Sequence, residues 1–307
     1  MFIADSHCDT LSGLRHGRDI SSLMINRDKM QAGGLCMQTF ALFTGSKGTL
    51  GTPYQDGIVM LSKRDELGIP IFNAMLPDTP PEYPCGVISI EGGEALEGRI
   101  KRLHEFYALA GIRMIALTWN FENEIGSPAK LGDKPGLKPF GLELLKEMDK
   151  LKIYADVSHL NEAGFWDIYD NMELPPIASH SNNKELCGVP RNLHKKQIKA
   201  IIERKGYIGI NFYTAFLTDK TDSTLEDVYR HIDSIMELGG EDVLGFGSDF
   251  DGIDSWPEGL SDATCYPKLV EYLLSRGYSE TTVEKIAGLN LWNLLKKADD
   301  LRPYNEA

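Results

Sequence analysis

Eight short runs of apolar and β-branched residues, spaced along the whole chain, constrain its fold more than any other feature. They are FIADSH (2–7), LCMQTFALF (35–43), GVISIEG (86–92), RMIALTW (113–119), IYADVSH (153–159), PPIASHS (175–181), YIGINFY (207–213) and VLGFGSDF (243–250). Amphipathic helical segments lie between and after them, at 94–110, 141–152, 195–205, 224–239 and 280–297. Strands that alternate with helices pair in parallel through crossover connections. Eight such units favour a closed (β/α)₈ TIM-like barrel over an open doubly wound sheet.

The length of the chain suits a single barrel domain over residues 1–307, with no internal repeat, low-complexity tract or linker. The segment IPIFNAM (69–75) is a candidate ninth strand and leaves the strand count open. The proline-rich stretch PDTPPEYP (77–84) is typical of a loop, and we expect it to precede the third strand.

Charge and cysteine usage exclude several classes of partner. The net charge is −13, with 45 acidic and 32 basic residues, which argues against nucleic acid or an anionic membrane as a partner. The five cysteines are scattered without a C-x-x-C pair, so we expect them to be reduced and mostly buried. The N-terminus has no basic segment followed by an apolar one, and no run of about 18 apolar residues occurs. We therefore expect a cytoplasmic protein.

Side chains able to bind metal or move protons follow most of the strand-like runs. They are His7, Asp9, Glu91, His159, His180 and Asp249. A single histidine after a strand is more often structural, and a single carboxylate there often caps a helix. The joint pattern points elsewhere, because the carboxyl ends of barrel strands converge on one mouth, where active sites are built. We expect the other four histidines to be surface residues, namely His16, His104, His194 and His231.

The chemistry of this set favours a metal centre. Imidazole and carboxylate ligands without thiolates suit zinc or a similar divalent ion. Five ligands exceed the three that usually hold one catalytic zinc, and a carboxylate that bridges two ions accommodates them better. Glu91 is the natural bridge, since it is the one glutamate of the set.

At these residues the chain resembles the membrane (renal) dipeptidase family and its bacterial soluble members, zinc metallopeptidases on a distorted (β/α)₈ barrel of the metallo-dependent hydrolase type. The matching segments are DSHCDT (5–10), SIEGG (89–93), GIRMIALTW (111–119), DVSHLN (156–161), ASHSN (178–182), PRNL (190–193), GINF (209–212), GFGSDFDG (245–252) and GLNLWNLL (288–295). They occur in the family's order, and the family's spacing of 21 residues separates His159 from His180.

The resemblance implies a centre of two zinc ions (Zn²⁺) per chain. His7 and Asp9 would bind one ion. His159 and His180 would bind the other, and Glu91 would bridge the two. A hydroxide held between the ions would attack the peptide bond of a dipeptide substrate.

The resemblance also assigns the substrate. Arg191, eleven residues after His180 as in the family, would hold the C-terminal carboxylate of the dipeptide, a task that suits its planar fork. Asp249 would lie beside the bridging solvent and relay its proton to the leaving nitrogen. The family accepts dipeptides with a D-residue at the C-terminal position, so L-Xaa-D-Xaa substrates are implied. A homodimer is one assembly that the resemblance allows.

Two positions depart from the family. Trp119 stands where well-known members carry a histidine that contacts the substrate carbonyl, and an indole N–H can donate one hydrogen bond but cannot transfer a proton. Asn120 or Asn123 on the same loop could supply the missing donor, while Trp119 either contacts the substrate or walls the pocket. Phe216 aligns with a family tyrosine that helps to bind the carboxylate, and Tyr213 is a candidate substitute.

Two other functions stay open from the sequence. The first is hydrolysis of other small amides, such as N-acyl amino acids or lactams, on the same binuclear site. The second is a metal-binding barrel that has lost catalysis, in which Trp119 in place of the family histidine would account for the loss. Arg191 favours a substrate with a free carboxylate, and Asp249 beside a full ligand set argues against the inactive version.

Overall fold

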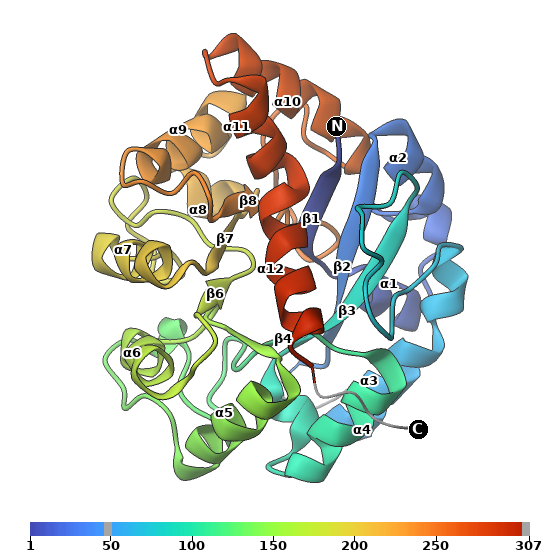
Figure 1. The fold of residues 1–307 in the computed structure, drawn as a ribbon, viewed down its shortest axis with the longest axis vertical. Coiled ribbons are helices and arrows are strands. Elements are labelled where there is room, and N and C mark those ends of the chain that lie inside the picture. The colour runs from blue at the N-terminus through green and yellow to red at the C-terminus, as the bar shows by residue number, and fades with distance from the viewer. Residues whose placement is uncertain (46–50, 303–307) are drawn as a thin grey trace.

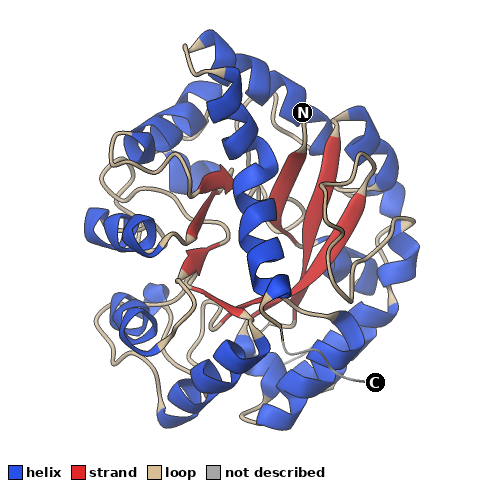
Figure 2. Cartoon of the chain, viewed as in Figure 1, coloured by secondary structure: helices blue, strands red, loops and turns tan. Residues whose placement is uncertain are grey.

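A computed structural model describes residues 1–45 and 51–302, and its centre is a closed barrel of eight parallel strands in sequence order (Figure 2). The strands are β1 (Ile3–Cys8), β2 (Leu35–Phe43), β3 (Cys85–Glu91), β4 (Met114–Ala116), β5 (Tyr154–Asp156), β6 (Ile177–Ala178), β7 (Tyr207–Ile210) and β8 (Leu244–Phe246). Each of the eight apolar runs contributes one strand, so the predicted (β/α)₈ barrel is confirmed.

The barrel is uneven because five of its eight strands, β4 to β8, are shorter than the runs that predicted them. β2 and β3 pair over seven residues, from Met37↔Cys85 to Phe43↔Glu91, whereas β5 and β6 share the single pair Asp156↔Ile177. Beyond that pair the backbone turns away from the ladder, and the N–H groups of Ser158 and Ser179 donate to the Asp156 carboxylate instead. The buried carboxylate thus replaces strand hydrogen bonds at the point where the site begins.

The candidate ninth strand is not part of the barrel. Within 69–75, a single bridge joins Ile71 to Gly86, supported by a hydrogen bond of 2.8 Å from Phe72 N to Gly86 O. The following stretch, 77–84, is a loop that leads into β3, as its prolines predicted.

Helices surround the barrel on its outer side (Figure 1). They are α1 (Thr10–Arg15), α2 (Arg27–Ala32), α3 (Pro53–Ser62), α4 (Ile100–Ala110), α5 (Pro139–Leu151), α6 (Glu162–Asn171), α7 (Lys195–Arg204), α8 (Thr214–Leu217), α9 (Leu225–Met236), α10 (Tyr266–Ser275), α11 (Glu280–Glu284) and α12 (Asn290–Asp300). All five predicted helical segments contain a helix, although the segment 94–110 begins with a short 3₁₀ turn, Gly93–Leu96, before α4. No helix in the described ranges is long and apolar enough to cross a bilayer.

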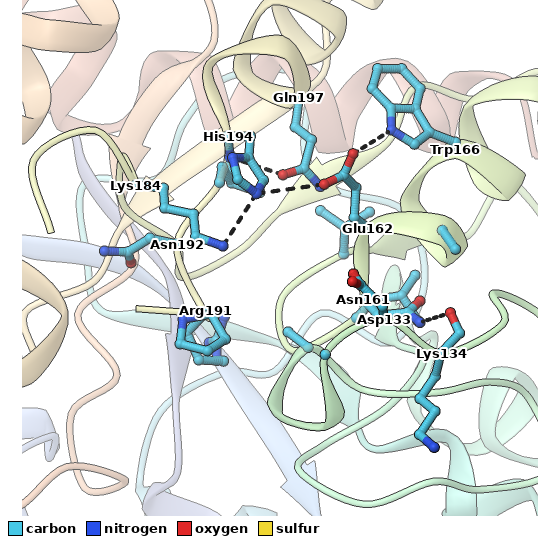
Figure 3. Close-up of a pocket in the computed structure, with 17 residues that line it drawn as sticks. Asp133, Lys134, Asn161, Glu162, Trp166, Lys184, Arg191, Asn192, His194 and Gln197 are labelled. Atoms are coloured by element: carbon cyan, nitrogen blue, oxygen red, sulfur yellow. Dashed lines mark hydrogen bonds and ion pairs between the residues drawn. The ribbon is translucent and has the colours of Figure 1, made fainter. Parts of the chain in front are cut away.

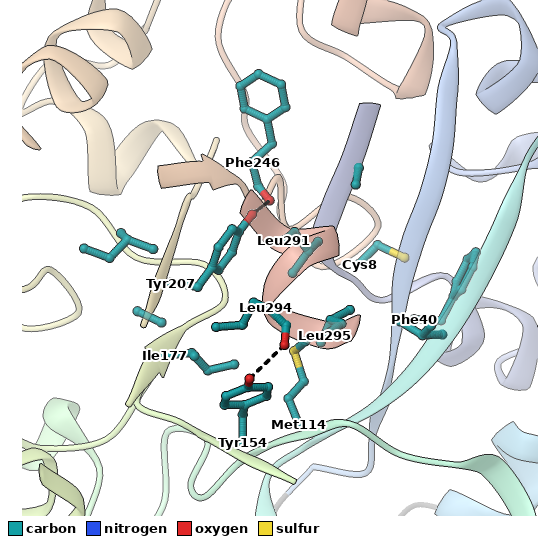
Figure 4. Close-up of a cluster of buried hydrophobic side chains, with 14 of the residues drawn as sticks. Cys8, Phe40, Met114, Tyr154, Ile177, Tyr207, Phe246, Leu291, Leu294 and Leu295 are labelled. Carbon is teal, nitrogen blue, oxygen red and sulfur yellow. Dashed lines mark hydrogen bonds between the residues drawn. The ribbon is translucent and has the colours of Figure 1, made fainter. Parts of the chain in front are cut away.

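The last helix, α12, closes the amino-terminal end of the barrel (Figure 1). Its contacts are with the first residues of the strands: Tyr154 donates a hydrogen bond of 2.8 Å to Leu294 O, and Asn290 Nδ2 donates to Leu244 O. Leu291 and Leu295 add apolar side chains to the same cluster (Figure 4). With this end plugged, the carboxyl-terminal mouth is the end that can hold a site.

A buried ion pair fastens α12 to the start of β4. Arg113 Nη2 lies 2.8 Å from Asp299 Oδ2, and neither side chain is exposed to solvent. The same guanidinium donates to Phe72 O and Ala74 O, while Arg302 Nη1 lies 3.2 Å from the second oxygen of Asp299. Backbone carbonyls thus satisfy the two terminal nitrogens of the Arg113 guanidinium, whereas its buried Nε has no hydrogen-bond partner among the described residues.

One expectation about the surface is wrong. His231, expected to be exposed, is completely buried on the inner face of α9. Its Nε2 lies 3.0 Å from Leu217 O, and its Nδ1 accepts a hydrogen bond of 3.1 Å from Asn183 N. Burial lowers the pKa of His231 to about 4, so it serves as a neutral structural link between α9, the end of α8 and the loop after β6.

Candidate metal centre

Six side chains predicted from sequence converge at the carboxyl-terminal mouth of the barrel. They are His7, Asp9, Glu91, His159, His180 and Asp249, contributed by β1, β3, β5, β6 and β8 or by the residues that follow those strands. β1 ends at Cys8, so Asp9 does not continue the strand face of Asp5 and His7 but lies at the start of α1. Asp5 lies deeper, where its carboxylate accepts hydrogen bonds from Ser248 N and the Tyr266 hydroxyl.

Glu91 lies at the centre of the group with its two carboxylate oxygens facing different histidines. Oε1 is 3.0 Å from His159 Nε2 and 3.6 Å from His180 Nε2. Oε2 is 3.5 Å from His7 Nε2. This is the arrangement that a carboxylate needs in order to join two neighbouring cation positions.

The remaining carboxylates surround His7. Its Nε2 lies 3.6 Å from both Asp9 Oδ2 and Asp249 Oδ1, and its ring stacks on that of His180 at 3.8 Å. Two triplets of ligand atoms each fall within 4.8 Å of one another, one on His7, Glu91 and His180 and one on His7, Asp9 and Asp249.

Unpaired polar atoms show that this group suits a cation. His7 Nε2 and Asp9 Oδ1 are buried and have no hydrogen-bond partner among the described residues. A buried polar atom without a partner costs about 1–3 kcal/mol, which a bound cation would offset. The donors are imidazole nitrogens and carboxylate oxygens, the set that zinc accepts in open catalytic sites. The residues present therefore fit a metal centre.

The electrostatics of the centre lead to the same conclusion. Burial raises the pKa of Glu91 to about 8, and the nearby Asp9 and Asp249 carboxylates contribute to the rise. Burial also lowers the pKa of His159 and of His180 well below the usual range, with Arg191 and His7 adding to the effect. Buried carboxylates this close together are stable in ionised form only when positive charge is placed among them.

The ring of His180 is held by a buried relay that sequence reasoning missed. Its Nδ1 lies 2.7 Å from Ser179 Oγ, and Ser179 donates its hydroxyl proton to Asp156 Oδ2. The serine oxygen must then accept from His180 Nδ1–H, which leaves Nε2 free to face the centre. No local motif signals this relay, because Asp156 precedes His159 in the motif DVSH but holds His180 through Ser179.

Asp249, the predicted proton-transfer residue, is fixed from the side of β7. Asn211 Nδ2 donates a hydrogen bond of 2.9 Å to Asp249 Oδ2, leaving Oδ1 directed at His7. Burial raises the pKa of Asp249 to about 6. The backbone of Asp249 is left-handed, with φ 64°, a strained conformation that is common at functional sites. Asn211 was not predicted as a site residue.

Two cavities lie at or near the centre. One, of about 400 Å³, opens on the centre and is lined by Asp9, Glu91, His159, Asp249, Trp119, Asn120, Tyr213 and Phe216, among others. The second, of about 570 Å³, lies beside it and is lined by Arg191, Lys184, His194 and Glu162 (Figure 3). The predicted carboxylate binder therefore lies in the wall of the neighbouring cavity.

Arg191 nevertheless contacts the residues around the centre. It is buried, and its Nη1 and Nη2 lie 3.4 Å from Ser181 Oγ and 3.2 Å from His180 O. Its guanidinium lies over the ring of Phe216 at 5.3 Å, and its Nε has no partner among the described residues. Arg191 thus retains an unused donor next to the centre.

Trp119 forms an aromatic wall. Its ring packs on Phe43 at 4.9 Å and on Phe121 at 5.5 Å, and it approaches the ring of His159 at 6.4 Å. Tyr213, the candidate substitute for a family tyrosine, packs on Phe216. Burial raises the pKa of Tyr213, and the negative charge of Asp254 raises it further.

The two asparagines of the Trp119 loop differ in their contacts. Asn120 Oδ1 lies 3.1 Å from His159 Nδ1, so its oxygen contacts a candidate ligand. Asn123 uses its amide within the loop: Nδ2 donates to Leu117 O and Glu94 Oε2, and Oδ1 accepts from Ile125 N. Asn123 is therefore a loop-forming residue and not an available donor.

A closed barrel with buried imidazoles and carboxylates at its mouth is typical of metal-dependent hydrolases. Comparison with known proteins is consistent with this class. Residues 85–307 match the model of the membrane dipeptidase family, peptidase family M19. The chain is 39% identical over 220 residues to a Klebsiella pneumoniae protein described as an uncharacterized protein in the pqqA 5′ region, covering 68% of this chain and 80% of that protein.

Further relatives extend the comparison. An uncharacterized dipeptidase of Schizosaccharomyces pombe is 34% identical over 219 residues, which are 70% of this chain and about half (53%) of that protein. The crystal structure of dipeptidase AC, a family M19 metallopeptidase, superposes with a TM-score of 0.87 at 26% identity, covering 97% of this chain and 98% of that one. A Rhodobacter sphaeroides metallopeptidase bound to a phosphinate mimic of L-Ala-D-Ala has the same fold, with a TM-score of 0.87 at 24% identity over 97% and 99% of the two chains.

This chain belongs to the membrane dipeptidase family, as its motifs predicted. The matched residues 85–307 include Glu91, His159, His180 and Asp249.

Proposed function

We propose that this protein hydrolyses the peptide bond of dipeptides, including L-Xaa-D-Xaa dipeptides, at a centre of two zinc ions. The observation that carries the proposal is the orientation of Glu91, whose oxygens face His159 and His180 on one side and His7 on the other. The D-residue preference rests on the family resemblance and on the ligand of the Rhodobacter structure, a mimic of L-Ala-D-Ala.

The residues divide into ligands and groups that handle the substrate. His7 and Asp9 would hold one ion, His159 and His180 the other, and Glu91 both. When bound, the ions supply Lewis-acid activation of water and of the scissile carbonyl. Asp249 then accepts the proton of the attacking water at Oδ1 and delivers it to the leaving nitrogen. Its Oδ2 is held by Asn211, so the other oxygen stays directed at the reacting atoms.

Binding of the substrate would use the cavity at the centre together with the neighbouring cavity that Arg191 lines. Arg191 would pair with the free C-terminal carboxylate through its unused Nε–H and its fork, while the aromatic rings of Trp119 and Phe43 exclude water from the cavity at the centre.

The experiment is a paired measurement of metal content and hydrolysis. We expect about two zinc ions per chain and chelator-sensitive cleavage of L-Ala-L-Ala or L-Ala-D-Ala by the purified protein. Glu91→Gln should lower both metal content and turnover, while the exposed Glu124→Gln serves as the matched control. Near-normal metal content and turnover in Glu91→Gln would refute the two-ion centre.

The same experiment separates the alternative functions. Two ions per chain without cleavage of either dipeptide, but with cleavage of an N-acyl amino acid or a lactam, would indicate a different amide hydrolase. Two ions without any hydrolysis would indicate a metal-binding barrel. Absence of metal after reconstitution would refute the centre itself.

A further inference from the structure

We propose that Asn120 is a positioning residue that sets the tautomer of His159 and thereby makes metal retention depend on the aromatic segment 119–121. The inference rests on the metal centre of the proposed function. It concerns a role for Asn120 different from the substrate contact that its place in the sequence suggested.

The two nitrogens of His159 face different surroundings. Nε2 points into the centre, 3.0 Å from Glu91 Oε1 and 3.1 Å from His180 Nε2. Nδ1 points outward, 3.1 Å from Asn120 Oδ1. A neutral imidazole carries one proton, and the nitrogen that binds a cation must be the unprotonated one. The proton therefore belongs on Nδ1, where the amide oxygen of Asn120 accepts it.

The supports of the two neighbouring histidines are unlike. His180 is held through Ser179 by the carboxylate of Asp156, and all three side chains are buried beneath the centre. His159 is held by a neutral amide from a loop, and Asn120 is partly exposed in the wall of the cavity. Second-shell partners of this kind typically change metal affinity by about 10- to 100-fold. The weaker support at His159 makes this ligand the more easily displaced of the two.

The aromatic segment determines where Asn120 lies. Trp119 is held between Phe43 and Phe121, at 4.9 and 5.5 Å, and its ring lies beside His159. Asn123 fixes the other end of the same loop through its bond of 2.8 Å to Leu117 O. Because Asn120 directly follows Trp119, packing of the indole holds the amide against Nδ1. This gives Trp119, which replaces a family histidine, a structural task at the centre.

His159 also has a left-handed backbone. Its φ is 68°, a left-handed conformation that is strained for a residue with a side chain. A hydrogen bond from the ring to Asn120 helps to keep the strained residue in the orientation that directs Nε2 inward.

The test compares metal affinity in two variants of similar side-chain size, of which only one keeps an acceptor for His159. Asn120→Leu keeps the size of the side chain and removes the acceptor, whereas Asn120→Asp keeps an acceptor for Nδ1–H. Glu122→Gln, an exposed neighbour that pairs with Lys138, is the control within the same loop. Zinc per chain is measured after dialysis against graded chelator, together with the melting temperature of each metal-free protein.

We expect Asn120→Leu to lose zinc at a chelator concentration about 10- to 100-fold lower than the wild type, with the melting temperature of the metal-free protein unchanged. Asn120→Asp and Glu122→Gln should retain zinc. Zinc retention in Asn120→Leu equal to that of the wild type, or equal loss in the Leu and Asp variants, would overturn the proposal. If the Leu variant does not fold, Asn120→Ser, which shortens the side chain, replaces it in the comparison.

A second readout does not depend on the added charge of the aspartate. Long-range ¹H–¹⁵N spectra of the metal-free protein report which imidazole nitrogen of His159 carries the proton. We expect a single Nδ1–H form in the wild type and a mixture of tautomers in Asn120→Leu; one unchanged form in both would contradict the proposal. Neither readout uses dipeptide hydrolysis, so a wild type that binds no zinc refutes the proposed function, whereas equal behaviour of zinc-bound variants refutes the role of Asn120 alone.

Discussion

Gly252 lies directly against the carboxylate of Asp9, so closely that a Cβ on residue 252 would be 2.1 Å from Asp9 Oδ2 and 2.8 Å from Asp249 Oδ1. Hydrogen bonds to the residues that follow β1 hold the loop after β8 in this position. Asp9 N donates to Phe250 O at 2.9 Å, and Thr10 Oγ1 donates to Asp251 Oδ2 at 2.7 Å. Two carboxylates of the centre therefore keep their places because residue 252 has no side chain.

Gly252→Ala should displace Asp9 or Asp249 and lower both zinc content and kcat/KM, the latter by at least about 10-fold, since a misplaced catalytic group can cost about 100-fold. The methyl group would meet the carboxylates at the mouth and not the apolar core, so we expect little change in the unfolding of the metal-free protein. Gly188→Ala, where an added Cβ meets no atom within 4 Å, is the control. A fully active Gly252→Ala enzyme would show that the centre tolerates the displacement.

Arg191 should act on substrate binding more than on chemistry. Loss of a charge-assisted hydrogen bond costs about 1.5–3 kcal/mol, so Arg191→Ala should raise KM for free dipeptides by about 10- to 100-fold with a smaller change in kcat. The effect should be much weaker for dipeptides with an amidated C-terminus, which lack the carboxylate. Arg191→Lys keeps the charge without the fork, so its KM for free dipeptides should lie between those of the wild type and of Arg191→Ala. Equal losses on free and amidated substrates would contradict the carboxylate assignment.

Asp299 should matter for stability and not for the reaction. Asp299→Ala leaves the buried Arg113 guanidinium without its counterion and should lower the free energy of unfolding by about 3–5 kcal/mol. Asp299→Asn keeps an acceptor for Arg113 and should cost less. Urea unfolding of the three proteins measures this. Since α12 closes the end of the barrel opposite the mouth, activity per folded molecule should stay the same. A loss below about 1 kcal/mol in the alanine variant would contradict the role of the pair.

His231 should make stability depend on pH. Its pKa is lowered from 6.5 to about 4 in the folded protein by burial, so the unfolded chain binds the proton more tightly. The stabilisation by neutral His231 is fully present above pH 6.5 and is lost as the pH falls from about 6.5 towards 4. At pH 5 the loss amounts to about 2 kcal/mol of the free energy of unfolding. Unfolding of the metal-free wild type and of His231→Gln at pH 7 and pH 5 measures it. We expect the wild type to lose about 2 kcal/mol more than the variant, and equal losses would contradict the shift.

The fold and the membership of the candidate centre could be predicted because their signals are local. Each barrel strand is a short apolar run, and each residue of the centre, from His7 to Asp249, lies at or just after the end of such a run. Convergence of the strand ends then follows from the barrel geometry alone. The prediction of a helix over 94–110 was less exact at its start, because periodicity does not reveal the break between the 3₁₀ turn and α4.

The remaining features depend on contacts between distant residues. His231 was expected at the surface because it falls in a helical stretch and not at a strand end, yet the packing of α9 onto the loop after β6 buries it. The cavity beside Arg191 arises where the residues after β4, β5 and β6 approach one another, and no single stretch of sequence describes it.

By itself, then, the sequence determined the eight strand–helix units, the imidazole and carboxylate types at the strand ends, and the family. The tertiary structure decided which oxygen of Glu91 faces which histidine, that Ser179 and Asp156 hold His180 while Asn120 holds His159, and that Gly252 admits Asp9. The physical reason is the distance along the chain over which each effect acts. Strand and helix propensities act over a few neighbouring residues, whereas hydrogen-bond partners and close approaches depend on strand register and loop paths across the whole barrel.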